Sequence, residues 1–256
     1  MNLPIVLHHG LGGRPGLKLG PVRLNYFRGI DLALGEGGRD VIVPRVHPTA
    51  GVAYRAEQLK QQIIARLDQL GRPDEPVIVV GHSMGGLDAR YMVSKLGMAG
   101  RVAAILSVTS PHRGSPVADW AVRNLDRRVP LMRVLGKLGW DLQAARDLTT
   151  DSCRRFNDEV PDAPGVRYFS VSAARPWHRV PPFAYACHRI ISAAEGENDS
   201  LVSVRSSQWG TSLGTWPADH WHTINHRLVL ELKDPTGDIA PYYRQAVEQV
   251  RAALSG

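Results

Sequence analysis

The feature that most constrains this chain is an abrupt change from strand-like to helix-like sequence within residues 77–93. Residues 77–80 are all β-branched, which is typical of a strand buried on both faces in a parallel sheet. Gly-His-Ser-Met-Gly follows at residues 81–85, and a helix-like stretch follows that. Such a sharp turn needs small residues, and it exposes Ser83 at its tip. The free N–H groups of the helix would then face negative charge that develops at this serine.

The Gly-x-Ser-x-Gly pattern is short, and a chain with 25 glycines can contain it by chance. Its place between an apolar strand and a helix favours a nucleophilic serine, because a nucleophile elbow has both neighbours. The alternative is a serine that only caps a tight strand–helix turn. A nucleophilic serine also requires a histidine and an orienting carboxylate elsewhere in the chain.

Composition restricts the class of protein around this turn. The chain has 256 residues, of which 43% are hydrophobic and 21% charged, enough for one sizeable core in an ordinary globular protein. The net charge of +7 comes from scattered arginines without a basic tract, so we expect a basic surface and no nucleic-acid partner. No apolar run approaches the length of a membrane span, and the first residues do not resemble an export signal. Two distant cysteines agree with a reducing compartment, so we expect a cytoplasmic protein.

Short apolar strands alternate with helices along the first half of the chain. This alternation predicts an α/β fold, with a mostly parallel, doubly wound sheet, helices on both faces and ligands at the carboxyl ends of the strands. We expect a single domain over residues 1–256. Strands are predicted at residues 4–8, 40–44, 77–80 and 102–108, and helices at residues 21–36, 54–70 and 87–93.

Residues 117–150 interrupt this alternation. Helical stretches at 117–125 and 131–142 follow one another without a strand between them. In the second stretch the leucines and a valine recur at helical spacing, with Arg133 and Lys137 displaced from them. We therefore expect a small helical cap. It is either fixed on the body or a mobile lid whose apolar face covers the site and makes transient contact with a lipid interface.

The partners of Ser83 follow from chain order, which in this kind of fold is nucleophile, acid and then histidine. Asp199 is the candidate acid, because it lies in a polar turn after the strand-like residues 189–193. Two glutamates, Glu195 and Glu197, compete with Asp199 for this role. The other alternative is that this segment is a solvated turn without a catalytic role. Three histidines come late enough to serve as the base: His220, His222 and His226.

Several further pieces of sequence occur in order over nearly the whole chain. They are residues 6–11, 26–30, 54–59, 81–86, 110–120, 147–150, 155–157, 198–202 and 219–225. Together they resemble the bacterial true lipases of the Pseudomonas and Burkholderia type and the triacylglycerol lipases of fungal mitochondria, members of the α/β-hydrolase superfamily. The resemblance implies a serine carboxylic ester hydrolase, a lipase or esterase, that works through an acyl-enzyme intermediate without a cofactor. Its substrate would be a small-molecule or lipid ester, with no obligate protein partner.

The resemblance assigns Ser83 as nucleophile, Asp199 as acid and His220 as base. In the bacterial enzymes the catalytic histidine opens a His-apolar-Asp-x-Val-Asn run. Residues 220–225 here read His-Trp-His-Thr-Ile-Asn, which favours His220 over the other two histidines.

The resemblance also implies an oxyanion hole formed by the backbone N–H groups of Leu11 and Met84. A glycine-rich loop at residues 9–13 would present the first of these groups. Arg55 matches an arginine that braces this loop in the bacterial enzymes.

The chain departs from the bacterial pattern where those lipases hold a structural calcium ion. His222 stands in place of one aspartate ligand, and residues 177–179, Trp-His-Arg, stand in place of another. Arg205 replaces a cysteine of their disulfide. We therefore expect no metal, and a histidine loop held by packing alone. The candidates for this packing are Trp216, Trp221 and Ile224.

Two other classes remain open. An acyltransferase would use the same three residues but favour another acceptor over water. A non-catalytic binding protein on this fold is the third possibility, and such proteins usually lose members of the triad.

Overall fold

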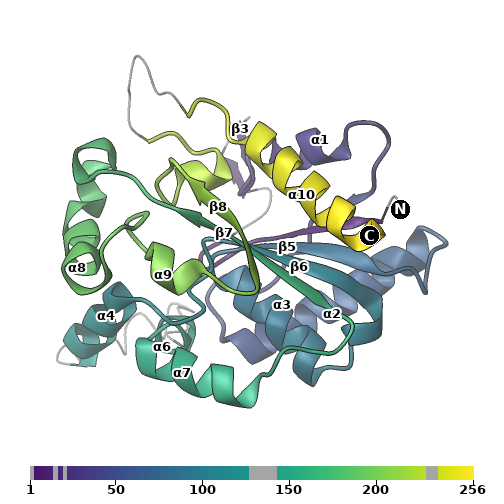
Figure 1. Ribbon diagram of the computed structural model, residues 1–256, viewed down its shortest axis with the longest axis horizontal. Coiled ribbons are helices and arrows are strands. Elements are labelled where there is room, and N and C mark those ends of the chain that lie inside the picture. Colours follow the sequence, from purple (N-terminus) through teal and green to yellow (C-terminus); the bar gives the residue numbers. More distant parts are fainter. Residues whose placement is uncertain (1–2, 14–16, 20–21, 127–142, 229–235) are drawn as a thin grey trace.

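The computed structural model is built around a six-stranded sheet in which every neighbouring pair of strands is parallel (Figure 1). In spatial order the strands are β4 (Val41–Ile42), β1 (Ile5–His8), β5 (Val77–His82), β6 (Val102–Val108), β7 (Arg167–Ala173) and β8 (Thr211–Trp216). The structure describes residues 3–13, 17–19, 22–126, 143–228 and 236–256. The α/β class with a doubly wound parallel sheet is confirmed.

Helices cover both faces of the sheet, as Figure 1 shows. Side chains of a strand alternate between the faces. Ile5 and Leu7 of β1 therefore pack in one core, with α1 (Ile30–Gly35) and α10 (Ala240–Ser255), whereas Val6 packs in the other, with α2 (Val52–Gln69) and α3 (Met84–Lys95). Burial on both faces explains why the central strands are continuous apolar runs.

The remaining helices lie mostly beyond the carboxyl ends of the strands. They are the short 3₁₀ turn η1 (Ala99–Arg101), α4 (Pro116–Asp126), α6 (Gln143–Asp147), α7 (Thr150–Glu159), η2 (Trp177–Arg179), η3 (Pro182–Ala184), α8 (Tyr185–Glu195), α9 (Val204–Ser207) and η4 (His222–Ile224). The helix α4 contacts α6, α7 and α8. It confirms the helix predicted at 117–125, whereas the one predicted at 131–142 lies outside the described residues. No helix of the described ranges has the length and apolarity needed to cross a membrane.

Two local predictions were wrong. Within the stretch 21–36, residues 22–24 form the strand β3 (Val22–Leu24), which pairs antiparallel with β2 (Leu17–Leu19). A helix starts only at Ile30, because Gly29 has a left-handed backbone (φ 76°) that ends any continuous helix there. Residues 189–193, predicted as a strand, lie inside α8, where His188 and Ile191 are buried at the i,i+3 spacing of one helix face.

Candidate active site

Ser83 forms the turn between β5 and α3. The strand ends at His82 and the helix begins at Met84, so a single residue makes the change of direction. Ser83 has φ 55° and ψ −129°, a conformation that side-chain-bearing residues rarely adopt and that costs about 1–3 kcal/mol. A Cβ on Gly81 would lie 2.7 Å from the Gly85 carbonyl group, so the turn tolerates no larger residue there. The sharp strand-to-helix turn predicted at Ser83 is confirmed.

The chain leaves β1 for β4 on one side and returns as β5 on the other side. In such sheets the crevice at this switch point, beyond the carboxyl ends of the strands, is where ligands bind. The loop after β1, residues 9–13, therefore lies against the elbow. A Cβ at Gly10 would come within 2.7 Å of the Ser83 Cβ, so only glycine permits this approach.

Arg55 holds this loop from beneath. Its guanidinium is fully buried and donates to the backbone oxygens of His9 (2.7 Å) and His47 (2.8 Å). It also donates to the Asp88 carboxylate at 2.9 Å. Burial lowers the pKa of His8, which favours the neutral imidazole ring. Its Nε2 atom lies 2.8 Å from the same Asp88 carboxylate, to which it donates. The bracing contact that the resemblance implied for Arg55 is therefore present, and it ties α2 and α3 to the loop.

Asp199 and His220 form a buried pair. The distance from His220 Nδ1 to Asp199 Oδ2 is 2.7 Å, and Asp199 is inaccessible to solvent. The other carboxylate oxygen accepts from the backbone N–H groups of Leu201 (2.9 Å) and Val202 (2.7 Å). With both oxygens fixed, the carboxylate can orient only one edge of the imidazole ring.

The two rival acids are placed differently. Glu195 accepts a hydrogen bond from Ser203, and Glu197 is exposed. Asp199 was predicted to follow a strand, and this premise was wrong, because it follows the helix α8. Its position comes instead from Asn198, which donates to the Gly196 carbonyl and accepts from the Ser200 N–H.

Ser83 and His220 line one cavity of about 280 Å³, together with Leu11. Most of the other lining residues are apolar, and three of them come from α4: Val117, Ala118 and Ala121. His222 and His226 are absent from this lining; His222 Nε2 instead lies 2.8 Å from the Gly237 carbonyl. The backbone N–H groups of Leu11 and Met84, predicted to form an oxyanion hole, have no hydrogen-bond acceptor among the described residues.

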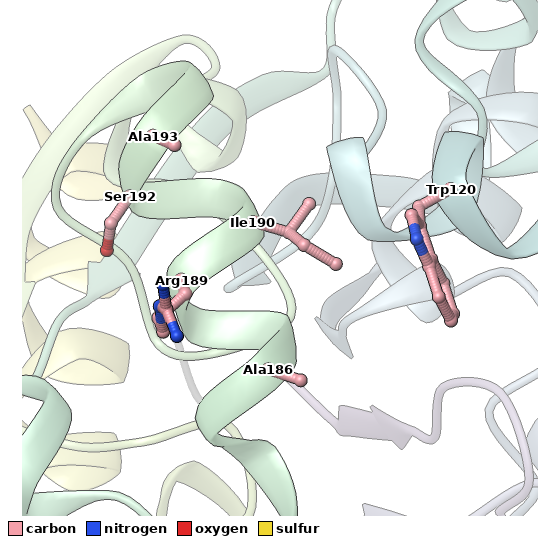
Figure 2. Close-up of a pocket in the computed structure, with 6 residues that line it drawn as sticks. All are labelled: Trp120, Ala186, Arg189, Ile190, Ser192 and Ala193. Atoms are coloured by element: carbon pink, nitrogen blue, oxygen red, sulfur yellow. The ribbon is translucent and has the colours of Figure 1, made fainter.

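A second hollow of about 810 Å³ lies between α4 and α8 (Figure 2). Ile190 and Ala186 of α8 point toward Trp120 of α4, whereas Ser192 points away on the other side of its helix. The described residues that line this hollow include no paired acid and base, and four of these six residues are apolar. Ser83 and His220 lie instead at the smaller cavity.

The ring of His82, the residue before Ser83, borders the same cavity. The centroids of the His82 and His220 rings are 4.7 Å apart. Burial, and after it the nearby His220, lower the pKa of His82 well below its usual value. His82 is therefore a neutral ring in the site near neutral pH.

Contacts beyond packing hold the loop that carries His220. Trp216 and Ile224 are buried in the core as predicted, whereas Trp221 is only partly buried. The prediction of packing alone was wrong, because buried Arg175 donates to the Asp219 carboxylate at 3.3 Å and to the Pro217 carbonyl at 3.2 Å. No local pattern marked this pair, whose members are 44 residues apart. In the described part of the chain, no group of three or more His, Cys, Asp or Glu side chains could hold a metal ion.

A doubly wound parallel sheet, a serine at the elbow and a His–Asp pair at the same cavity define the α/β-hydrolase class. Solved structures that resemble this chain have the same fold. The Staphylococcus hyicus lipase has a TM-score of 0.76 at 16% identity, covering 100% of this chain and 98% of that one. The mature Bacillus licheniformis lipase BlEst2 has a TM-score of 0.69 at 22% identity, covering 89% and 88%.

Sequence comparison gives the family. A family model described as the PGAP1-like alpha/beta domain matches residues 52–134. The chain is 30% identical to the triacylglycerol lipase of Pseudomonas fragi, over 87% of this chain and 88% of that protein. It is also 30% identical to triacylglycerol lipase 2 of Saccharomyces cerevisiae, over 82% of this chain, and spans 65% of that relative's length. The chain therefore belongs to the triacylglycerol lipase family, a family of carboxylic ester hydrolases.

The buried histidines predict a loss of stability in mild acid. Burial lowers the pKa of four histidines, which are His8, His9, His82 and His112. The pKa of His9 falls to about 3. Below about pH 6.5 the unfolded chain binds protons that the folded chain does not, so stability falls as the pH falls. Between pH 7 and 5.5 we expect His9, His82 and His112 each to reduce the free energy of unfolding by about 1 kcal/mol. Urea unfolding at the two pH values measures this, and equal free energies would contradict it.

The Arg175–Asp219 pair predicts a large cost for its removal. Arg175→Met leaves a buried carboxylate unpaired, which costs about 3–5 kcal/mol of unfolding free energy. Arg154→Met is the matched control, because Arg154 forms an exposed pair with Asp151 and its replacement should cost less than about 0.5 kcal/mol.

Since Arg175 already ties the loop that carries His220, we expect EDTA to leave the melting temperature of the unmodified protein unchanged. A drop with chelator that calcium reverses would refute this account of the loop.

Proposed function

We propose that this protein hydrolyses carboxylic esters, including lipid esters, through an acyl-enzyme at Ser83. The observation that carries the proposal is that Ser83, a strained serine at the turn, shares an apolar cavity with His220. The Nδ1 atom of His220 lies 2.7 Å from the carboxylate of buried Asp199. A turn-capping serine needs neither partner. The yeast relative, of which this chain spans 65%, and the P. fragi relative are both named triacylglycerol lipases, which supports the choice of ester chemistry.

In the proposed reaction the Nδ1–H of His220 donates to Asp199 Oδ2, which leaves Nε2 as the basic nitrogen. This nitrogen takes the Ser83 proton as Oγ attacks the ester carbonyl carbon, and the adjacent carboxylate stabilises the imidazolium that forms. His220 then returns the proton to the leaving alcohol. Water repeats the same steps on the acyl-enzyme and releases the acid.

The N–H groups of Leu11 and Met84 would hold the oxyanion of each tetrahedral intermediate. Met84 is the first residue of α3, so its N–H lies at the positive end of a helix. Leu11 follows Gly10, which packs on Ser83. One such donor contributes roughly 10²–10³ in rate. Its contribution depends on the loop being fixed before the substrate binds.

The apolar lining of the cavity suits the acyl chain or the apolar alcohol of a lipid ester. We infer that α4 is the described part of a cap, because three of its residues wall the cavity. Trp120, on the same helix, is half exposed. An aromatic side chain with this exposure is suited to contact with an apolar interface.

The first test of this function is Ser83→Ala, which removes the attacking oxygen and should reduce hydrolysis of a short p-nitrophenyl ester at least 10³-fold. His220→Ala should have a similar effect, whereas His226→Ala should retain most activity because His226 lies outside the cavity. Circular dichroism checks that each variant is folded. Covalent labelling of Ser83 by a fluorophosphonate provides an independent readout. Turnover by Ser83→Ala above a few per cent would exclude the proposal.

The second test concerns α4. If this helix moves to admit substrate, velocity should rise more steeply once the ester exceeds its solubility limit, because an apolar interface stabilises the open position. Velocity is measured across that limit with one ester of intermediate chain length. A curve that passes smoothly through the limit would indicate a fixed cap.

A further inference from the structure

A continuous chain of hydrogen bonds crosses the site beneath the cavity. The N–H of Gly10 donates to the Tyr26 hydroxyl at 3.1 Å, and this hydroxyl is 2.8 Å from His82 Nδ1. On the other edge of the ring, His82 Nε2 is 2.8 Å from the Thr223 hydroxyl. That hydroxyl donates to the backbone oxygen of His220 at 2.6 Å.

The two ends of the chain fix the direction of every bond in it. A backbone N–H can only donate and a carbonyl oxygen can only accept. Because Thr223 uses its one proton on His220, it must accept from His82 Nε2–H. The bare Nδ1 of a neutral His82 then accepts from Tyr26, whose oxygen accepts from Gly10. All donors and acceptors are matched only when His82 is neutral and carries its proton on Nε2.

This series of hydrogen bonds joins three parts of the site that are far apart in the sequence. Gly10 precedes Leu11, whose N–H is assigned to the oxyanion. Thr223 lies three residues after His220, in the turn that begins at Asp219. His82 stands between them and is bonded directly to Ser83, and both His82 and Thr223 are fully buried.

We propose that His82, Tyr26 and Thr223 are positioning residues that lock the oxyanion loop, the nucleophile and the loop of the base into one unit through this chain. The proposal rests on the triad assigned above. The neutral ring also has an electrostatic consequence. It lies beside His220, which becomes an imidazolium during the reaction, and a second cation at a centroid distance of 4.7 Å would oppose that charge.

The decisive comparison is Thr223→Val with Thr223→Ser. Valine has nearly the same shape without the hydroxyl, whereas serine keeps the hydroxyl. Thr223 does not line the cavity, so we expect kcat to fall about 10- to 100-fold in Thr223→Val, with KM changed less than about threefold. Thr223→Ser should recover most of this loss. Thr109→Val controls for the substitution itself, because Thr109 is buried and its hydroxyl has no hydrogen-bond partner in the described part of the chain.

A spectroscopic test is independent of turnover. In ¹⁵N-labelled protein near pH 7, His82 should be neutral with the proton on Nε2. In Thr223→Val that proton loses its acceptor, so it should move to Nδ1 and donate to Tyr26. A positively charged His82, or a neutral His82 with its proton on Nδ1 in the unmodified protein, would refute the proposed hydrogen-bond directions.

The outcomes separate this inference from the proposed function. If Ser83 is essential but the two Thr223 variants have the same kcat, the positioning role is wrong and the function stands. If Ser83→Ala remains active, the proposed function fails, and the positioning role fails with it. An equal loss of kcat in Thr109→Val would also refute the role, because the effect would then be unrelated to the chain.

Discussion

The contact on which the rest of the site depends is the approach of Gly10 to Ser83. It follows from the pairing of β1 with β5, in which His8 lies opposite Gly81. The residues that continue each strand therefore leave the sheet side by side at its carboxyl edge. A side chain at position 10 would push the loop away from the serine. Arg55 and Asp88 fill the space beneath the loop, so the approach is supported by a buried ion pair as well as by backbone.

Local sequence was enough to predict the parts of the fold that are set by local forces. Residues 102–108 form a strand with the predicted bounds because they are an apolar run, interrupted only by Ser107, in the middle of a sheet covered on both faces. The elbow is predictable for a related reason. Gly81 and Gly85 stand two positions to either side of Ser83, and the sequence changes from β-branched to helical within a few positions. The acid is an instructive case, since Asp199 is the residue that pairs with His220, although the strand from which it was inferred is a helix.

Other parts could not be predicted, because they depend on contacts between distant residues. The strand β8 is mostly exposed at the edge of the sheet and has a glycine in its middle, so it lacks the apolar alternation that marks a strand. The ring of His82 meets a threonine that is 141 residues away. Arg175 gave no sign that it would pair with Asp219, because a single arginine in a basic chain is more often a surface residue. These contacts appear only when the sheet order is known.

The histidine loop is held from two sides, by Arg175 on Asp219 and by His82 on Thr223. Its polar groups are thus oriented before a substrate arrives, which is the condition under which fixed dipoles act most strongly on a developing charge. In the proposed function, discrimination between substrates then rests mainly on the apolar walls of the cavity, among them Val117 and Leu148. An apolar wall distinguishes one methylene group by only about 1–3 kcal/mol. Selectivity for chain length should therefore be graded, and a sharp preference would require a polar contact with the substrate that these walls do not provide.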